Sequence, residues 1–129
     1  MSEKQVQSDL QALREIVRQF VDERDWDQFH TPKNLACALS VEAAELLEPF
    51  QWLEKGTAQE LDEAARIQVR HEMADVLTYL IRLADKLDVD LYQAVLEKMA
   101  INRAKYPAER VRGDARKYNA YPEEGSRPE

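Results

Sequence analysis

Residues 57–87 read TAQELDEAARIQVRHEMADVLTYLIRLADKL and form the longest helical pattern in the chain. Apolar residues recur along one face of this stretch, and neither Gly nor Pro interrupts it. Thr57 and Glu60 have the spacing of a capping box, which favours a helix start at Thr57. We therefore predict one long amphipathic helix that follows Thr57 and ends near Leu87.

Three shorter stretches carry similar helix signals and span residues 8–25, 31–49 and 90–106. Each opens with residues typical of a helix N-terminus: Ser8 with Gln11, Thr31 with Pro32, and Asp90 with Gln93. Because a helix seldom continues up to or through a proline, Pro49 and Pro107 mark two of the ends. Four helices with short connections and no strand alternation predict an all-α fold, an antiparallel four-helix bundle.

The composition changes after residue 106, where three of the five prolines and two of the three glycines lie. We predict that residues 1–106 form the helical domain. Residues 107–129 are then an extended C-terminal tail, disordered over Pro122–Glu129, because that segment lacks apolar side chains.

Charge and composition exclude several classes of function. The chain has 129 residues, with 18 basic and 25 acidic side chains, and its formal net charge is −7. We therefore expect no binding to nucleic acid polymers or to anionic membranes. Three scattered glycines exclude a P-loop and a dinucleotide fingerprint, and the single Cys37 excludes an internal disulfide and a Cys-built zinc site. No signal pattern or membrane-spanning stretch is evident, so we expect a cytoplasmic protein.

Two pairs of acidic residues share a helix face with apolar side chains: Glu42 with Glu45, and Glu72 with Asp75. Two carboxylates about 6 Å apart repel by roughly 3 kcal/mol at an effective dielectric near 20, so converging pairs need neutralisation. Protonation is one means, and a divalent cation with oxygen ligands, Mg²⁺ or Mn²⁺, is another. The alternative is that each pair is hydrated at a helix edge or neutralised by Arg70 or Arg82.

Two further groups of residues are compatible with a nucleotide. Lys98, Asn102 and Lys105 align with the apolar side of the last helix, where they can meet anionic oxygen or simply cover apolar surface. Aromatic residues flank the second helix: Trp26, Phe29 and His30 before it, Phe50 and Trp52 after it. They can stack on a base or anchor the loops, and His30 can equally serve a local hydrogen bond.

A series of short motifs, in a fixed order along residues 20–118, includes the two acidic pairs. The acidic pairs read Glu42-Ala-Ala-Glu45 and Glu72-Met-Ala-Asp75. Around them stand Glu23-Arg-Asp-Trp-Asp-Gln-Phe-His30, Pro32-Lys-Asn-Leu35, Phe50-Gln-Trp52, Lys98-Met-Ala-Ile-Asn102-Arg-Ala-Lys-Tyr-Pro107, Arg112-Gly113 and Lys117-Tyr118. With these motifs the sequence resembles the MazG-like superfamily of all-α nucleoside triphosphate pyrophosphohydrolases, in particular its dCTP pyrophosphatase branch.

The resemblance implies Mg²⁺-dependent cleavage of a nucleoside triphosphate, dCTP or a modified dCTP, between the α- and β-phosphates. It implies that Mg²⁺ is held by Glu42, Glu45, Glu72 and Asp75. For the mechanism we expect in-line attack of a water on phosphorus, with Glu45 as the general base. It places the phosphates at Lys98, Asn102, Arg103 and Tyr106. The base and sugar would lie at His30, Trp52, Tyr79 and Trp26. Members of the family assemble as dimers or tetramers.

Two other classes compete with this interpretation. A ferritin-like di-metal protein needs Glu-x-x-His ligation, whereas His71 directly precedes Glu72 and His30 is the only other histidine. A non-catalytic helical module could use the acidic stripes to recognise a basic helix of a partner. Such a module should show no binding heat with Mg²⁺ and dCTP.

Overall fold

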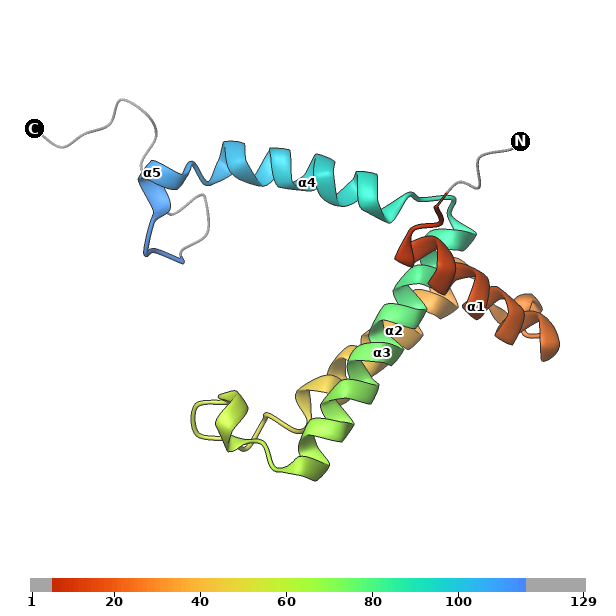
Figure 1. Cartoon of the computed structure of the whole chain (residues 1–129), viewed down its shortest axis with the longest axis horizontal. Coiled ribbons are helices and arrows are strands. Elements are labelled where there is room, and N and C mark those ends of the chain that lie inside the picture. The colour runs from red at the N-terminus through yellow and green to blue at the C-terminus, as the bar shows by residue number, and fades with distance from the viewer. Residues whose placement is uncertain (1–5, 116–129) are drawn as a thin grey trace, which may run out of the picture. The chain divides into compact units, whose positions relative to one another are not determined.

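The computed structural model describes residues 6–115, and this part of the chain is helical with no strand (Figure 1). The long helices are α1 (Asp9–Glu23), α2 (Pro32–Leu47), α3 (Glu63–Lys86) and α4 (Leu91–Lys105). The short elements are the 3₁₀ turns η1 (Asp27–Phe29) and η2 (Ala58–Glu60), and the helix α5 (Ala108–Val111). The prediction of an all-α fold with four long helices is confirmed. No described helix has both the length and the apolar character needed to cross a membrane.

Three predicted helix starts are confirmed by capping hydrogen bonds. Ser8 and Gln11 form a reciprocal capping box at α1. The hydroxyl of Thr31 accepts a hydrogen bond from the backbone N–H of Asn34 at 3.2 Å, with Pro32 as the first residue of α2. At α4 the carboxylate of Asp90 accepts from the N–H of Gln93 at 3.1 Å. Each cap satisfies an N–H group that the first helical turn leaves without a partner.

The predicted start of the longest helix at Thr57 is wrong. Only a short 3₁₀ turn follows Thr57, and α3 begins at Glu63, where Asp62 caps it by accepting from the N–H of Ala65 at 2.8 Å. The carboxylate of Glu60 has another task, because it accepts hydrogen bonds from the backbone N–H groups of Glu54 and Lys55, each at 3.0 Å. A second capping residue five positions downstream therefore starts the helix, while Glu60 ties down the preceding loop.

The chain divides into two units, Met1–Val89 and Asp90–Glu129. In the first unit, α2 and α3 lie side by side and run antiparallel (Figure 1). Residues at the beginning of α2 therefore meet the end of α3, and residues at its end meet the beginning of α3. Helix α1 also packs on α3, and the buried apolar side chains come from these three helices: Val21, Leu35, Ile81 and Ala84.

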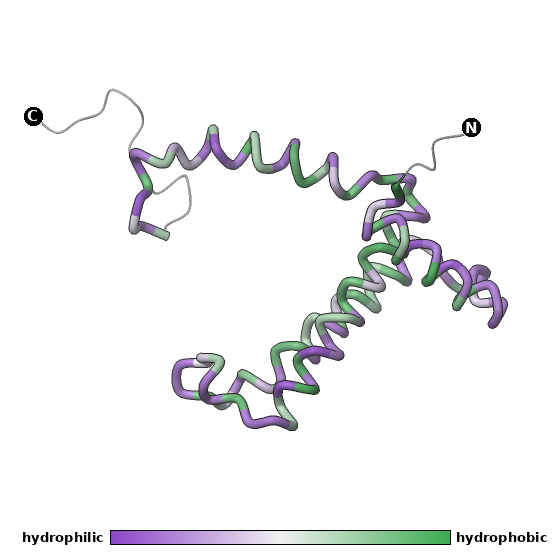
Figure 2. Tube along the Cα trace, in the orientation of Figure 1, coloured by the Kyte–Doolittle hydropathy of each residue, from purple (hydrophilic) through white to green (hydrophobic). Residues whose placement is uncertain are grey.

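The second unit has α4 and α5 as its described helices, and neither buries a residue. Short apolar and polar stretches are interspersed along all of α4 (Figure 2). The short helix α5 corrects the prediction that the chain is extended directly after residue 106. Residues 116–129, with the predicted disordered end, lie outside the described residues. The single helical domain over residues 1–106 stays a prediction.

Candidate metal and nucleotide site

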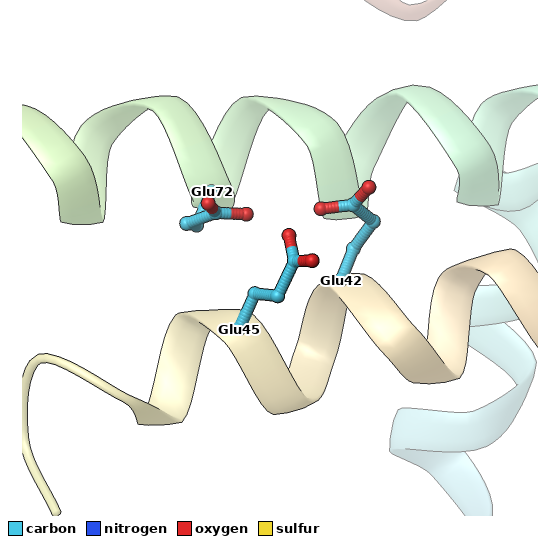
Figure 3. Close-up of side chains that lie close together, drawn as sticks. All are labelled: Glu42, Glu45 and Glu72. Carbon is cyan, nitrogen blue, oxygen red and sulfur yellow. The ribbon is translucent and has the colours of Figure 1, made fainter.

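Three of the predicted acidic residues converge between α2 and α3. Glu42, Glu45 and Glu72 each offer a carboxylate oxygen, and these three atoms lie within 4.8 Å of one another. Figure 3 shows Glu42 and Glu45 reaching from α2 towards Glu72 of α3. The spacing of three residues puts Glu42 and Glu45 on one face of α2, and the antiparallel packing brings Glu72 opposite them. All three side chains are half-buried.

The cluster is electrostatically incomplete without a further positive group. Burial, then the neighbouring carboxyl groups of Glu45 and Glu72, and then the charge of Asp75 raise the pKa of Glu42 to about 7. The Oε2 atoms of Glu42 and Glu72 are buried, and no described group donates a hydrogen bond to either. Buried acceptors without donors are costly, so this arrangement favours a bound cation or a shared proton. Carboxylate oxygens are the ligands that hard divalent cations prefer.

Neither arginine considered from the sequence neutralises the cluster. Among the described residues, Arg70 forms no ion pair, and the ion pairs of Arg82 go to Asp27 and Asp85. The alternative of neutralisation by Arg70 or Arg82 is therefore wrong for this structure.

The fourth predicted ligand, Asp75, is exposed and does not join the group of three oxygens. Its charge is nevertheless close enough to contribute to the raised pKa of Glu42. Asp75 lies three residues after Glu72, so it shares the α3 face that meets α2. Its role as a metal ligand stays a prediction.

The predicted base-binding residues of the first unit fall into two environments. His30 and Tyr79 are half-buried. Trp26 is 43% exposed and packs edge-on against Phe20, with ring centroids 5.6 Å apart, so it also anchors its loop. Trp52 is 88% exposed on the turn after α2. An indole that packs on so little of its own chain is available to a ligand.

The predicted phosphate-binding residues belong to the second unit. Asn102 and Tyr106 are half-buried at the end of α4, and Lys98 and Arg103 are exposed. Lys98, Asn102 and Arg103 lie near the end of that helix, and Tyr106 caps it, where its backbone N–H donates to the carbonyl of Asn102 at 2.8 Å. Their role at the phosphates stays a prediction.

Sequence reasoning missed the relation between Arg82 and His30. The sequence suggests Arg82 only as a counter-ion for the acidic pairs, whereas in the structure its guanidinium Nε–H donates to Nδ1 of His30 at 3.1 Å. The available signal was an arginine inside the apolar run Tyr79-Leu-Ile-Arg-Leu-Ala84. A charged residue at such a position needs a dedicated set of partners.

This chain is similar to known proteins in both sequence and fold. Residues 37–120 match the model of the MazG-like family. The chain is 45% identical over 115 residues to dCTP pyrophosphatase 1 of Homo sapiens, covering 88% of this chain and 68% of that protein. The Bos taurus protein of the same name is 44% identical with the same coverage. A crystal structure of a pyrophosphatase from Archaeoglobus fulgidus DSM 4304 is 40% identical, with a TM-score of 0.73, covering 82% of this chain and 99% of that one.

Proposed function

Because this chain belongs to the MazG-like family, we propose that it hydrolyses dCTP, or a modified dCTP, to the monophosphate and pyrophosphate. The relatives named dCTP pyrophosphatase and the pyrophosphatase of similar fold support the reaction class. The single observation that carries the proposal is the group of three carboxylates, within 4.8 Å, that comes from two helices. Such a group favours a bound cation, and a triphosphate normally carries one.

The donor set fits Mg²⁺. Glu42, Glu45 and Glu72 would hold the ion, and Asp75 would complete the set. The two buried oxygens without donors, on Glu42 and Glu72, are the structural reason to expect an ion at this place. Mg²⁺ has hard-acid character and accepts carboxylate together with phosphate oxygens, whereas nothing in this cluster offers the sulfur or nitrogen ligands typical of zinc. When bound, the ion would neutralise the charge that develops on the phosphate oxygens.

The remaining steps fall to side chains of this chain. Glu45 takes the proton from the water that attacks phosphorus in line with the leaving pyrophosphate. Lys98, Asn102 and Arg103 donate hydrogen bonds to phosphate oxygens, together with the phenol of Tyr106. The base and sugar are held by four side chains: His30, Trp52, Tyr79 and Trp26.

A panel of triphosphates tests this proposal. We expect the purified protein, with Mg²⁺, to prefer dCTP and 5-substituted dCTP over purine triphosphates, and to release pyrophosphate rather than phosphate. The products are identified by chromatography. Release of dCDP and phosphate would place the cleavage elsewhere, and equal rates with purine triphosphates would remove the assignment to dCTP. Absence of both hydrolysis and nucleotide-dependent binding heat would favour the partner-binding module.

The metal-free protein should lose stability as the pH rises from about 4.5 to about 7, the pKa values of the Glu42 carboxyl before and after folding. In that range the folded state binds the proton more tightly than the unfolded state, so the free energy of unfolding falls with rising pH. Mg²⁺ takes the place of the proton, so it should raise the melting temperature more at about pH 8 than at about pH 5. Thermal unfolding with EDTA and with Mg²⁺ at both pH values measures this.

The matched variants for that measurement are Glu42→Gln and Glu48→Gln. Glu42→Gln removes the titrating group, so the dependence of the melting temperature on pH and on Mg²⁺ should shrink together. Glu48 is exposed at the end of α2 and lies outside the cluster, so Glu48→Gln should behave as the wild type. An equal effect of Mg²⁺ at both pH values would contradict the assignment of the metal to these carboxylates.

We also infer a homodimer or homotetramer. On α3, the side chains of Ile67, Met73 and Leu77 are 51%, 57% and 40% exposed. Apolar faces of this kind are normally covered, and association of identical chains is the commonest means. Sedimentation should give a mass of at least twice 15.0 kDa, and a mass of 15.0 kDa at assay concentrations would contradict the inference.

A further inference from the structure

Arg82 is the one buried charged residue among residues 6–115, with 6% of its surface exposed. It lies on α3 between Ile81 and Ala84, which are buried apolar residues. A guanidinium out of water is costly unless its N–H groups meet acceptors, so its partners are the reason that it is tolerated.

Three different acceptors surround the guanidinium. One terminal nitrogen donates to Oδ1 of Asp27 at 2.5 Å, and the other lies 3.5 Å from Oδ2 of Asp85. Nε–H donates to Nδ1 of His30 at 3.1 Å. Arg82 therefore joins α3 to Asp27 of η1 and to His30, the residue that directly follows η1.

The two carboxylates are themselves held in place. Asp85 accepts both a bond from Nε of Arg18 at 2.7 Å and one from a terminal nitrogen of Arg18 at 2.5 Å. Asp27 also accepts from Nζ of Lys86 at 2.8 Å. The orientation of the guanidinium is thus fixed from two sides, which leaves its Nε–H directed at the imidazole.

This geometry determines the state of the His30 ring. Arginine stays protonated and has only donors, so the nitrogen that faces it must carry a lone pair. The ring proton then sits on Nε2, and protonation of Nδ1 would break the bond to Arg82. Burial lowers the pKa of His30, and the charges of Arg82 and Lys86 lower it further, while Asp27 acts in the opposite direction.

We propose that Arg82 is a positioning residue that holds His30 neutral, with Nδ1 capped and Nε2–H presented as the donor to the nucleotide. The role of Nε2–H as a donor rests on the proposed function, because that role requires His30 to be part of the nucleotide site. The hydrogen bond by which Arg82 keeps the His30 ring neutral does not depend on that function.

Nuclear magnetic resonance of the full-length protein labelled with ¹⁵N-histidine tests the proposal directly. The chain has two histidines, so a His71→Gln variant assigns the signals. We expect a neutral His30 with a proton on Nε2 and an unprotonated Nδ1. In Arg82→Met the titration midpoint of His30 should rise. In Lys86→Met, which removes the other cation on Asp27 but keeps the bond to His30, the neutral ring should keep its proton on Nε2.

Enzyme kinetics supply the second readout. Loss of one oriented hydrogen bond to the substrate should raise the KM for dCTP roughly 3- to 10-fold in Arg82→Met, with little change in kcat. The KM of this variant should also rise as the pH falls and His30 becomes charged. Arg82→Lys keeps the positive charge but lacks the planar fork, so it should share the KM defect without the rise in midpoint.

The possible outcomes are separable. A wild-type His30 with its proton on Nδ1 would overturn the proposal without any variant. An unchanged midpoint in folded Arg82→Met, checked by circular dichroism, would also overturn it. If Arg82→Met does not fold, Arg82→Lys decides through its KM, and an unaltered KM would overturn the proposal. Confirmed ring behaviour in a protein that does not hydrolyse dCTP would refute the proposed function alone.

Discussion

Glu45→Gln should lower the rate of pyrophosphate release from dCTP by roughly 10²- to 10⁴-fold, the range typical of a lost general base. Glutamine has nearly the same shape as glutamate, but its amide cannot take a proton from water at neutral pH. The substitution also removes one negative charge from the group of three carboxylates, which weakens the hold on Mg²⁺. The measurement is kcat with saturating Mg²⁺, which separates lost chemistry from lost metal affinity.

The fold of the Glu45→Gln variant should be intact. In the metal-free protein the variant should be at least as stable as the wild type, because it relieves repulsion within the cluster. The exposed Glu48, which caps the C-terminus of α2 three residues after Glu45, provides the matched control, and Glu48→Gln should keep normal turnover. A Glu45→Gln enzyme with near-normal kcat would remove Glu45 from the mechanism and leave the carboxylates only a binding role.

Trp52→Ala should raise the KM for dCTP roughly 5- to 160-fold, because stacking of a base on an aromatic ring contributes about 1–3 kcal/mol. The free energy of unfolding should hardly change, since the Trp52 side chain is 88% exposed and packs on little of its own chain. The turn that carries it is nevertheless ordered by backbone hydrogen bonds from Phe50 to Leu47 at 2.9 Å and from Leu53 to Phe50 at 3.0 Å. The backbone that presents Trp52 is therefore ordered, although the side chain itself is exposed.

Two further variants make this test specific to stacking. Trp52→Phe should recover part of the affinity, because a smaller aromatic ring still stacks. Ile16→Ala removes a 62% exposed apolar side chain on α1, outside the predicted site, and should leave KM unchanged. A Trp52→Ala protein that loses stability but keeps its KM would show that Trp52 serves association between chains rather than the nucleotide.

The helix starts show where sequence reasoning succeeds and where it fails. Ser8, Thr31 and Asp90 each meet their partner three residues away, so the decisive hydrogen bond is local. At Thr57 the same rule failed, because Asp62 offered a second cap and the carboxylate of Glu60 was taken by the backbone of the preceding loop. Where two capping residues lie close together, the sequence pattern alone does not show which of them starts the helix.

The sequence pattern likewise predicts some positions in the candidate site correctly and others not. The apolar surroundings of Glu42 and Glu45 in the sequence indicated that these carboxylates face inward, and the structure brings them to Glu72. The same pattern predicts that Asp75 faces inward like the three glutamates, but Asp75 is exposed. Helical periodicity gives the direction of a side chain to about one quarter of a turn, which does not decide the position of a residue at the edge of a face.

The sequence by itself determined the helical class, three of the four long-helix starts and the inward direction of Glu42, Glu45 and Glu72, because these depend on the pattern of residues within a few turns. Only the tertiary structure decided that Glu72 lies opposite Glu42 and Glu45, and that Arg82 meets His30 across 52 positions of the chain. The register between α2 and α3 sets the first pairing, and the packing of the segment before α2 against the end of α3 sets the second. That register follows from the packing of two complete helix faces, a property that no short motif contains.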